Sequence, residues 1–244
     1  MKLKHRALLM PWAGGQQSYT QKVKGTAAAN LLAYWTQSES SGTTITDTSG
    51  NGRTGTYTVV TLGVAGIGDG NTAATYNGTT SKGDVFGASL AAAINGSEGT
   101  IMGWGIVSAA GVWTDGAGRQ LLEIGDGAGN RLVLQKSAVN NALTTNYRAG
   151  ATNASISPAL SVTTWFHFAM TWSVSASEVK AYVNGAQSGA SITVLGTWGA
   201  APTRAFIGAR TTTPNDVWSG SIAHVAVWST PLTAGQIAAL ATVP

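Results

Sequence analysis

Residues 165–185, with the sequence WFHFAMTWSVSASEVKAYVNG, decide the fold class of this 244-residue chain. Within Trp165–Trp172, Phe, Phe, Met and Trp occupy every second position, and alternate side chains of a β-strand point to the same face. In Glu178–Val183, we expect Val179, Ala181 and Val183 to face inward and Lys180 and Tyr182 to face outward. Asn184-Gly185 favours a type I′ turn, whose two central residues need a positive φ. The stretch is therefore predicted to form strands with one face in a sandwich core.

Similar strand candidates recur along the chain. They are Asn30–Trp35, Thr72–Tyr76 before Asn77-Gly78, Thr100–Val107, Gln120–Gly125, Arg131–Gln135, Ala205–Ala209 and Ser221–Ser229. One helix is predicted near the C-terminus, where Thr233 and Gln236 form a capping box and Leu232 and Ile237 form a hydrophobic staple. The pattern predicts an all-β fold: a two-sheet antiparallel jelly-roll sandwich with a short C-terminal helix and an extended N-terminal arm.

The arm is the basic stretch of residues 1–27, and residues 28–244 are predicted to form one domain. Its positive charges are Lys2, Lys4, Arg6, Lys22 and Lys24, and no acidic residue precedes Glu39. Such an arm can dock on a partner or remain a solvated tail, and we expect it to dock. Pro11 interrupts its short apolar stretch, so we expect no signal peptide.

The composition narrows the function classes. The absence of cysteine excludes disulfides, thiolate zinc sites and cysteine nucleophiles. Only 10% of the residues are charged, and the body beyond the arm lacks a basic stripe, so we do not expect nucleic-acid binding. No apolar run approaches the roughly 20 residues that a membrane-spanning helix needs.

Several segments occur in an order that points to a known family. After residues 165–185 come Phe206-Ile-Gly208, Trp218–Trp228 and Leu232–Ile237, while Leu31–Trp35 and Asp47–Gly52 precede them. In this order the segments resemble laminin-G-like domains of the concanavalin A-like lectin/glucanase superfamily, which form pentraxin-like jelly rolls. The resemblance covers residues 28–241. It implies a two-sheet jelly roll that binds glycans or proteins, often with calcium, and some relatives occur in viral tail and capsid proteins.

Catalysis finds little support in the sequence. Glycoside hydrolases of the same superfamily place their carboxylates as Glu-x-Asp-x-x-Glu on one strand face, and the nearest approach here is Glu123-Ile-Gly-Asp126. We expect Glu123 to be exposed and Asp126 to begin a turn on the opposite side. His167 and His224 lie in strand candidates and are predicted to be hydrogen-bonded structural residues. We therefore expect no enzyme activity.

A metal site remains open at the loop Asp47-Thr-Ser-Gly-Asn51. Asp47 and Asn51 could offer oxygen ligands to calcium, with Asp69 or Asp216 as a partner from a distant loop. The alternative is an Asx turn, in which Asp47 bonds its own backbone.

Aromatic residues offer the best route to glycan recognition, because sugar rings stack on them. Trp113, Trp198 and Trp218 lie in loop-like settings and are the candidate ligand-binding residues. The alternative is that they are core or subunit-interface residues.

Together these features predict a non-catalytic binding or structural protein, a virion surface or decoration component whose lectin-like domain is anchored by the arm. We expect a homo-oligomer that contacts other virion proteins and binds a glycan or host-surface ligand. The alternative is a secreted or cell-surface carbohydrate-binding module, with calcium as a candidate cofactor, in an extracellular location.

Overall fold

Strand β12 (Phe166–Ser173) shows how the layers of the molecule arise. In the computed structural model, which describes residues 17–127 and 129–244, this strand is buried along its whole length. Its larger side chains, Phe166, Phe168, Met170 and Trp172, belong to the main apolar core, as predicted. Ala169 belongs to a second cluster on the opposite face. This sheet is therefore covered on both sides.

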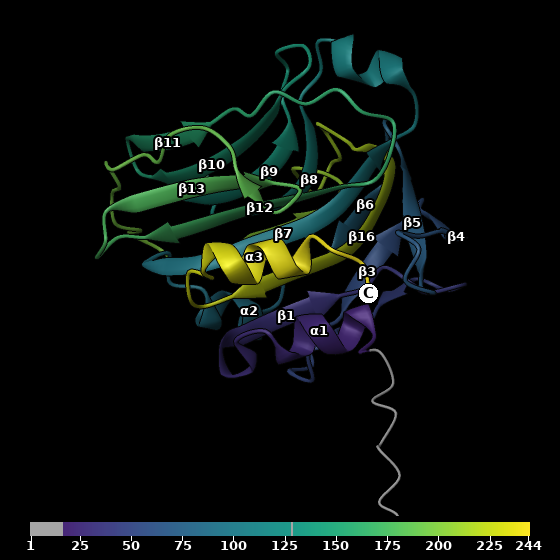
Figure 1. Cartoon of the computed structure of the whole chain (residues 1–244), viewed down its shortest axis with the longest axis horizontal. Coiled ribbons are helices and arrows are strands. Elements are labelled where there is room, and N and C mark those ends of the chain that lie inside the picture. The colour runs from purple at the N-terminus through teal and green to yellow at the C-terminus, as the bar shows by residue number, and fades with distance from the viewer. Residues whose placement is uncertain (1–16, 128) are drawn as a thin grey trace, which may run out of the picture.

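Two antiparallel sheets lie face to face (Figure 1). Sheet A has the order β14 (Ala186–Gln187), β13 (Glu178–Val183), β12, β7 (Glu98–Val107), β16 (Ser219–Trp228), β5 (Thr72–Asn77) and β4 (Thr61–Ala65), with β1 (Leu31–Trp35) also paired to β16. Sheet B has the order β11 (Thr152–Ile156), β10 (Leu143–Ala149), β9 (Arg131–Lys136), β8 (Arg119–Gly125), β15 (Arg204–Ile207), β6 (Lys82–Asp84), β3 (Gly55–Thr58) and β2 (Thr44–Ile45). The predicted all-β antiparallel sandwich is confirmed.

Among residues 17–127 and 129–244, three short helices and two 3₁₀ turns accompany the sheets. The helices are α1 (Tyr19–Gly25), α2 (Ala88–Ala93) and α3 (Ala234–Leu240), and the 3₁₀ turns are Ala28–Asn30 and Ala110–Thr114. The α3 capping box is present as predicted, because Thr233 Oγ1 accepts from Gln236 N and the Gln236 side chain accepts from Thr233 N. None of the helices in the described residues is long and apolar enough to cross a membrane.

Helices α1 and α3 close the outer face of sheet A. Tyr19 and Val23 from α1 pack with Trp104, Trp228 and other residues of the sheet and of α3 in the second cluster. Figure 1 shows α3 in front of β7 and β16 and α1 beside β1. The described end of the predicted arm therefore contains a helix that packs on the sandwich, while Lys2, Lys4 and Arg6 lie outside the described residues.

Tyr182 was expected to face outward with Lys180. It does leave the main core, but it is 2% exposed because it lies in the helix-covered second cluster. The outward face of this strand is therefore not a solvent face at Tyr182.

The turns at Asn184-Gly185 and Asn77-Gly78 differ. Asn184 and Gly185 both have positive φ, at 49° and 84°, as the predicted type I′ turn requires. At Asn77-Gly78 only Gly78 has a positive φ, and the Asn77 side chain instead accepts hydrogen bonds from the backbone of Thr79, Thr80 and Ser81. This longer turn carries the chain from β5 in sheet A to β6 in sheet B.

Candidate functional site

Two of the three predicted tryptophan platforms lie inside the sandwich. Trp113 and Trp218 are each 1% exposed, and both belong to the main core. The Trp113 indole donates to Val162 O at 2.7 Å, and its ring packs against Phe166. No sugar ring can stack on a side chain enclosed in this way, so the structure supports the alternative, that these are core residues.

Trp198 lies nearer the surface, at 9% exposed, beside a shallow hollow next to α2. Its ring stacks on Tyr147, with centroids 6.5 Å apart. The hollow is lined by Ala91, Ala92, Ile94, Asn95 and Gly199–Ala201. Because Trp198 is 9% exposed and also belongs to the main core cluster, little of the indole is accessible to a ligand.

The Asp47 loop has the geometry of an Asx turn. Asp47 Oδ1 accepts from Ser49 N at 2.9 Å and from Tyr34 N at 3.1 Å, and Oδ2 accepts from Arg53 N at 2.8 Å. Asn51 donates its amide to Leu31 O and Leu32 O. Both side chains are thus used in holding the loop to β1.

The proposed distant metal partners are engaged as well: Asp69 pairs with His224 and Asp216 with Arg210. No cluster of three or more His, Cys, Asp or Glu suited to a metal occurs in residues 17–127 and 129–244. The Asp47 side chain is thus engaged by backbone N–H groups, as the alternative of an Asx turn predicts.

Lys22, predicted to belong to a partner-binding arm, caps α3 within the same chain. Its Nζ donates to Ala239 O at 3.2 Å and to Thr242 O at 2.8 Å. A cation beside carbonyls at a helix C-terminus is favourable. Lys24 is exposed on α1 and stays a candidate partner contact.

The clearest constellation of charged side chains lies on the outer face of sheet B. Pairing between strands places Arg204, Gly125, Arg131 and Arg148 in one row across β15, β8, β9 and β10. Arg131 and Arg148 are directly opposite each other. Gly125, which has no side chain, separates Arg204 from Arg131. Three arginines therefore share one line across the sheet.

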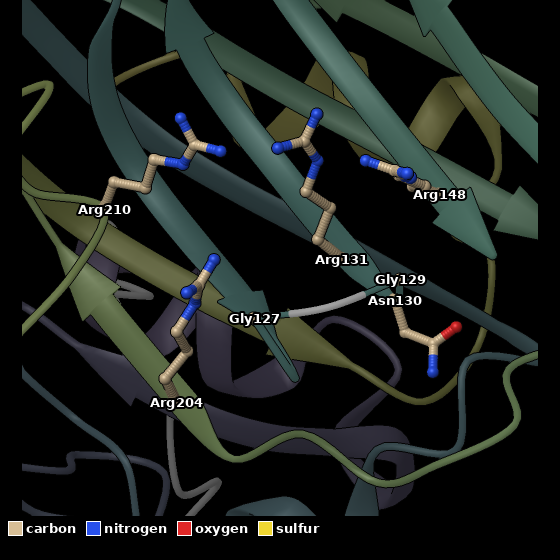
Figure 2. Close-up of a pocket in the computed structure, with 7 residues that line it drawn as sticks. All are labelled: Gly127, Gly129, Asn130, Arg131, Arg148, Arg204 and Arg210. Atoms are coloured by element: carbon tan, nitrogen blue, oxygen red, sulfur yellow. The ribbon is translucent and has the colours of Figure 1, made fainter. Parts of the chain in front are cut away.

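Arg210, in the loop after β15, completes what we call the arginine pocket. The pocket is lined by Gly127, Gly129, Asn130, Arg131, Arg148, Arg204 and Arg210, with no acidic residue among them. Figure 2 shows that the four arginine side chains come from separate segments around the same part of the sheet. The hollow measures about 60 Å³. That is room for a few water molecules or one small charged group.

Glu123 lies in the neighbouring row of the sheet, opposite Phe206 and Val133. Its side chain is fully buried, and Oε1 pairs with Arg204 while Oε2 lies 3.8 Å from Arg210 Nε. Burial raises the pKa of Glu123, and the arginines act against that rise. The expectation that Glu123 is exposed was wrong, because this outer face is walled in by long arginine side chains.

Asp126 does begin the predicted turn. Its Oδ1 accepts from the backbone N–H groups of Gly129 and Asn130, at 2.9 and 3.0 Å, and Oδ2 accepts from the Asn130 amide. The carboxylate thus shapes the β8–β9 turn that forms one wall of the arginine pocket.

The arginines repel one another. Burial lowers the pKa of Arg131, and Arg210, Arg148 and Arg204 act in the same direction, while Glu123 opposes them. Arg131 Nε donates to Asn146 Oδ1 at 2.9 Å and Arg148 Nε to Gly150 O at 3.1 Å, so both are held by neutral acceptors. The pocket is electrostatically suited to an anion.

The two predicted structural histidines lie elsewhere, on the outer face of sheet A. His167 is buried, and burial lowers its pKa to about 3. His224 sits where β16 changes its neighbour from β5 to β1, with φ 51°. It contacts Tyr34 Oη at 2.6 Å through Nδ1 and Asp69 Oδ2 at 3.1 Å through Nε2. The prediction of a hydrogen-bonded structural residue is confirmed for His224.

These features define a β-sandwich of the lectin type. A family model of the concanavalin A-like lectin/glucanases superfamily matches residues 88–238, and the chain belongs to this superfamily. The resemblance read from the sequence is thereby confirmed. No curated protein sequence matches the chain significantly.

Several solved structures share the fold. Trypanosoma rangeli sialidase in complex with sialic acid matches at 15% identity and a TM-score of 0.63, over 87% of this chain and 33% of the sialidase. Domain 4 of AbnA, an arabinanase from Geobacillus stearothermophilus, in complex with arabinotriose, matches at 18% identity and a TM-score of 0.59, over 87% of this chain and 98% of that domain.

The CBM40 of Ruminococcus gnavus IT-sialidase, bound to α2,3-sialyllactose, matches at 16% identity and a TM-score of 0.50, over 60% of this chain and 83% of the module. At such identities these likenesses show the fold. The present chain spans one third of the length of the sialidase.

Proposed function

We propose that this protein is a non-catalytic carbohydrate-binding protein that holds a glycan over the arginine pocket of sheet B. The observation that carries the proposal is the row of arginines on an outer face that no helix of the described chain covers, in contrast to sheet A. Membership of a lectin-type superfamily supports it, as do two sandwich neighbours solved with sugars.

The same face offers partners for sugar hydroxyls. Asn153 on β11 is exposed and Gln135 on β9 is half-buried, both on the same face as the arginines, whereas Asn146 is buried and bonds Arg131 and Asn153. Amide groups both donate and accept, which suits hydroxyl groups. The guanidinium groups add further donors in a fixed geometry.

A binding role is supported over catalysis by the state of the acids. Glycoside hydrolysis uses two carboxyl groups on either side of the scissile bond. Here Glu123 is buried against Arg204, and Asp126 accepts hydrogen bonds from its own turn. Neither carboxylate is presented to a sugar as a nucleophile or an acid.

A glycan array tests the proposal, followed by amide hydrogen exchange with the best ligand. We expect binding to a subset of glycans, protection of β8, β9 and β10, and no change on β7 and β12 of sheet A. No reducing sugar should be released from the bound glycan. Silence on all glycans, or protection confined to sheet A, would refute the proposal.

The location remains a proposal from the sequence: a virion surface, with an extracellular location as the alternative. The basic residues Lys2, Lys4, Arg6 and Lys24 support an anchoring role. Co-sedimentation of the protein with purified particles, with and without residues 1–16, tests this role; loss of attachment on truncation is the expected result. Attachment that persists without these residues would count against the anchor.

A further inference from the structure

The arginine pocket departs from the way that sheets normally place charge. Like charges directly opposite each other destabilise a pair of strands, and opposite charges stabilise it. Arg131 and Arg148 face each other in register, and Arg204 extends the row beyond Gly125. The facing pair Arg131 and Arg148 is therefore unfavourable by itself.

The nearby acids do not balance the row. Glu123 serves Arg204 and lies near Arg210, and Asp216 pairs with Arg210 at 3.2 Å. Even when Asp126 of the adjoining turn is counted with these two, four guanidinium groups exceed three carboxylates. Arg131 and Arg148 line the hollow, and their Nε groups donate hydrogen bonds to neutral oxygen atoms rather than to carboxylates.

Arg204 provides a second observation that points to a ligand. Its Nε is buried and has no hydrogen-bond partner among the described residues. A buried donor without a partner costs free energy that a bound acceptor would restore.

The size of the hollow limits what can enter it. About 60 Å³ is too small for a sugar ring but accommodates one charged substituent. Guanidinium groups match planar oxyanions, because two N–H groups can bind two oxygens side by side.

We propose that the arginine pocket binds the anionic group of an acidic sugar, a carboxylate or a sulfate, while the ring lies across the neighbouring amides. This inference rests on the proposed carbohydrate binding and adds the charge class of the ligand. Arg131 and Arg148 are the main contacts, with Arg204 and Arg210 on the other side of the hollow.

The test is calorimetric titration with matched oligosaccharide pairs: lactose against sialyllactose, an oligogalactose against an oligogalacturonate, and a sulfated against an unsulfated disaccharide. We expect at least one acidic member to bind about tenfold or more tightly than its neutral counterpart, with affinity that falls as salt is raised. The carboxylate and sulfate arms identify which anion is preferred.

Arg131→Gln and Arg148→Gln should each weaken acidic binding by roughly 10- to 100-fold and so reduce the ratio of acidic to neutral affinity. Lys180→Gln on sheet A removes the same charge far from the pocket and should have no effect. Equal binding of acidic and neutral glycans, or an acidic preference untouched by both arginine variants, would overturn the inference yet leave carbohydrate binding standing. Failure of every glycan to bind would instead reject the proposed function itself.

Discussion

The outer faces of the two sheets differ in how their charged groups are paired. On sheet A, α1 and α3 cover a polar cluster in which Asp69 and Tyr34 contact His224, and Tyr19 bonds Trp104 and Leu240. On sheet B no helix of the described chain covers the face, and positive charges exceed negative ones. On the first face the charged groups are paired within the chain, and on the second we propose that an added anion balances the excess positive charge.

This comparison explains why burial alone does not identify a site. Both faces contain buried ionisable groups, and His224 has a strained backbone. Strain is often found at functional sites, but here it marks a register shift against β7, between Ala223 and Ala226, where β16 exchanges β5 for β1. What separates the two faces is whether the charges are matched.

The largest effect is expected from a substitution on the outer face of sheet A, which α1 and α3 cover. Tyr19→Ala removes a fully buried ring together with its hydrogen bonds to Leu240 O and from Trp104. We expect the free energy of unfolding to fall by about 3–5 kcal/mol, as for other large-to-small changes at buried aromatic residues. Urea denaturation measures it.

Arg148→Gln on the open face is the matched control, and it should change stability by no more than about 0.5 kcal/mol. A loss below about 1 kcal/mol for Tyr19→Ala would show that α1 is not an integral part of the fold.

A smaller loss of stability is expected when the Glu123 carboxylate on the outer face of sheet B is removed. Glu123→Gln leaves Arg204 and Arg210 without their shared carboxylate and should cost about 1–3 kcal/mol. Because an anion bound only to the folded state stabilises it, millimolar sulfate should restore part of this loss.

Thermal unfolding in sulfate and in sodium chloride of equal ionic strength separates anion binding from screening. Lys180→Gln reports the general effect of sulfate on the fold. The prediction is wrong if Glu123→Gln and Lys180→Gln respond to sulfate alike.

Most of the fold could be predicted from the sequence because its strands alternate. Glu178–Val183 has the predicted bounds, and the capping box at Thr233 lies where the local pattern places it. Signals of this kind depend on neighbours within a few residues. The helix α1 was missed because its seven residues lie in a basic stretch, although Ser18 and Gln21 form the same kind of capping box.

The arginine pocket could not be predicted in the same way. Arg131, Arg148 and Arg204 are separated by up to 73 positions in the sequence, and they form a row only through the register of four strands. Each arginine alone is typical of a solvent-facing position. The tryptophans misled the interpretation for a related reason, since Trp113 and Trp218 come from loop-like sequence but fold back into the core.

The smallest expected effect is on the pH dependence of the free energy of unfolding. It compares Asp69, on the helix-covered face of sheet A, with the more exposed Asp115. Burial acts to raise the pKa of Asp69, but hydrogen bonds from His224 and Asn71 outweigh it and lower the pKa to about 2. A carboxyl whose pKa is lower in the folded state stabilises the protein above its unfolded value, near 3.8, and loses that contribution as the pH falls toward 2. We expect a loss of up to about 2 kcal/mol across this window, which Asp69→Asn should abolish.

Asp115 provides the counterpart. Burial again acts to raise its pKa, while Lys136, Ala117 and Arg119 together lower it to about 2. Its side chain is 24% exposed, against 1% for Asp69, so water reaches the carboxylate even though its partner Lys136 is fully buried. We therefore expect Asp115→Asn to change the stability between about pH 5 and pH 2 less than Asp69→Asn does. Urea titrations of both variants between about pH 5 and pH 2 measure the two slopes. A larger change for Asp115→Asn would mean that the covered face of sheet A contributes less to acid stability than its matched charges imply.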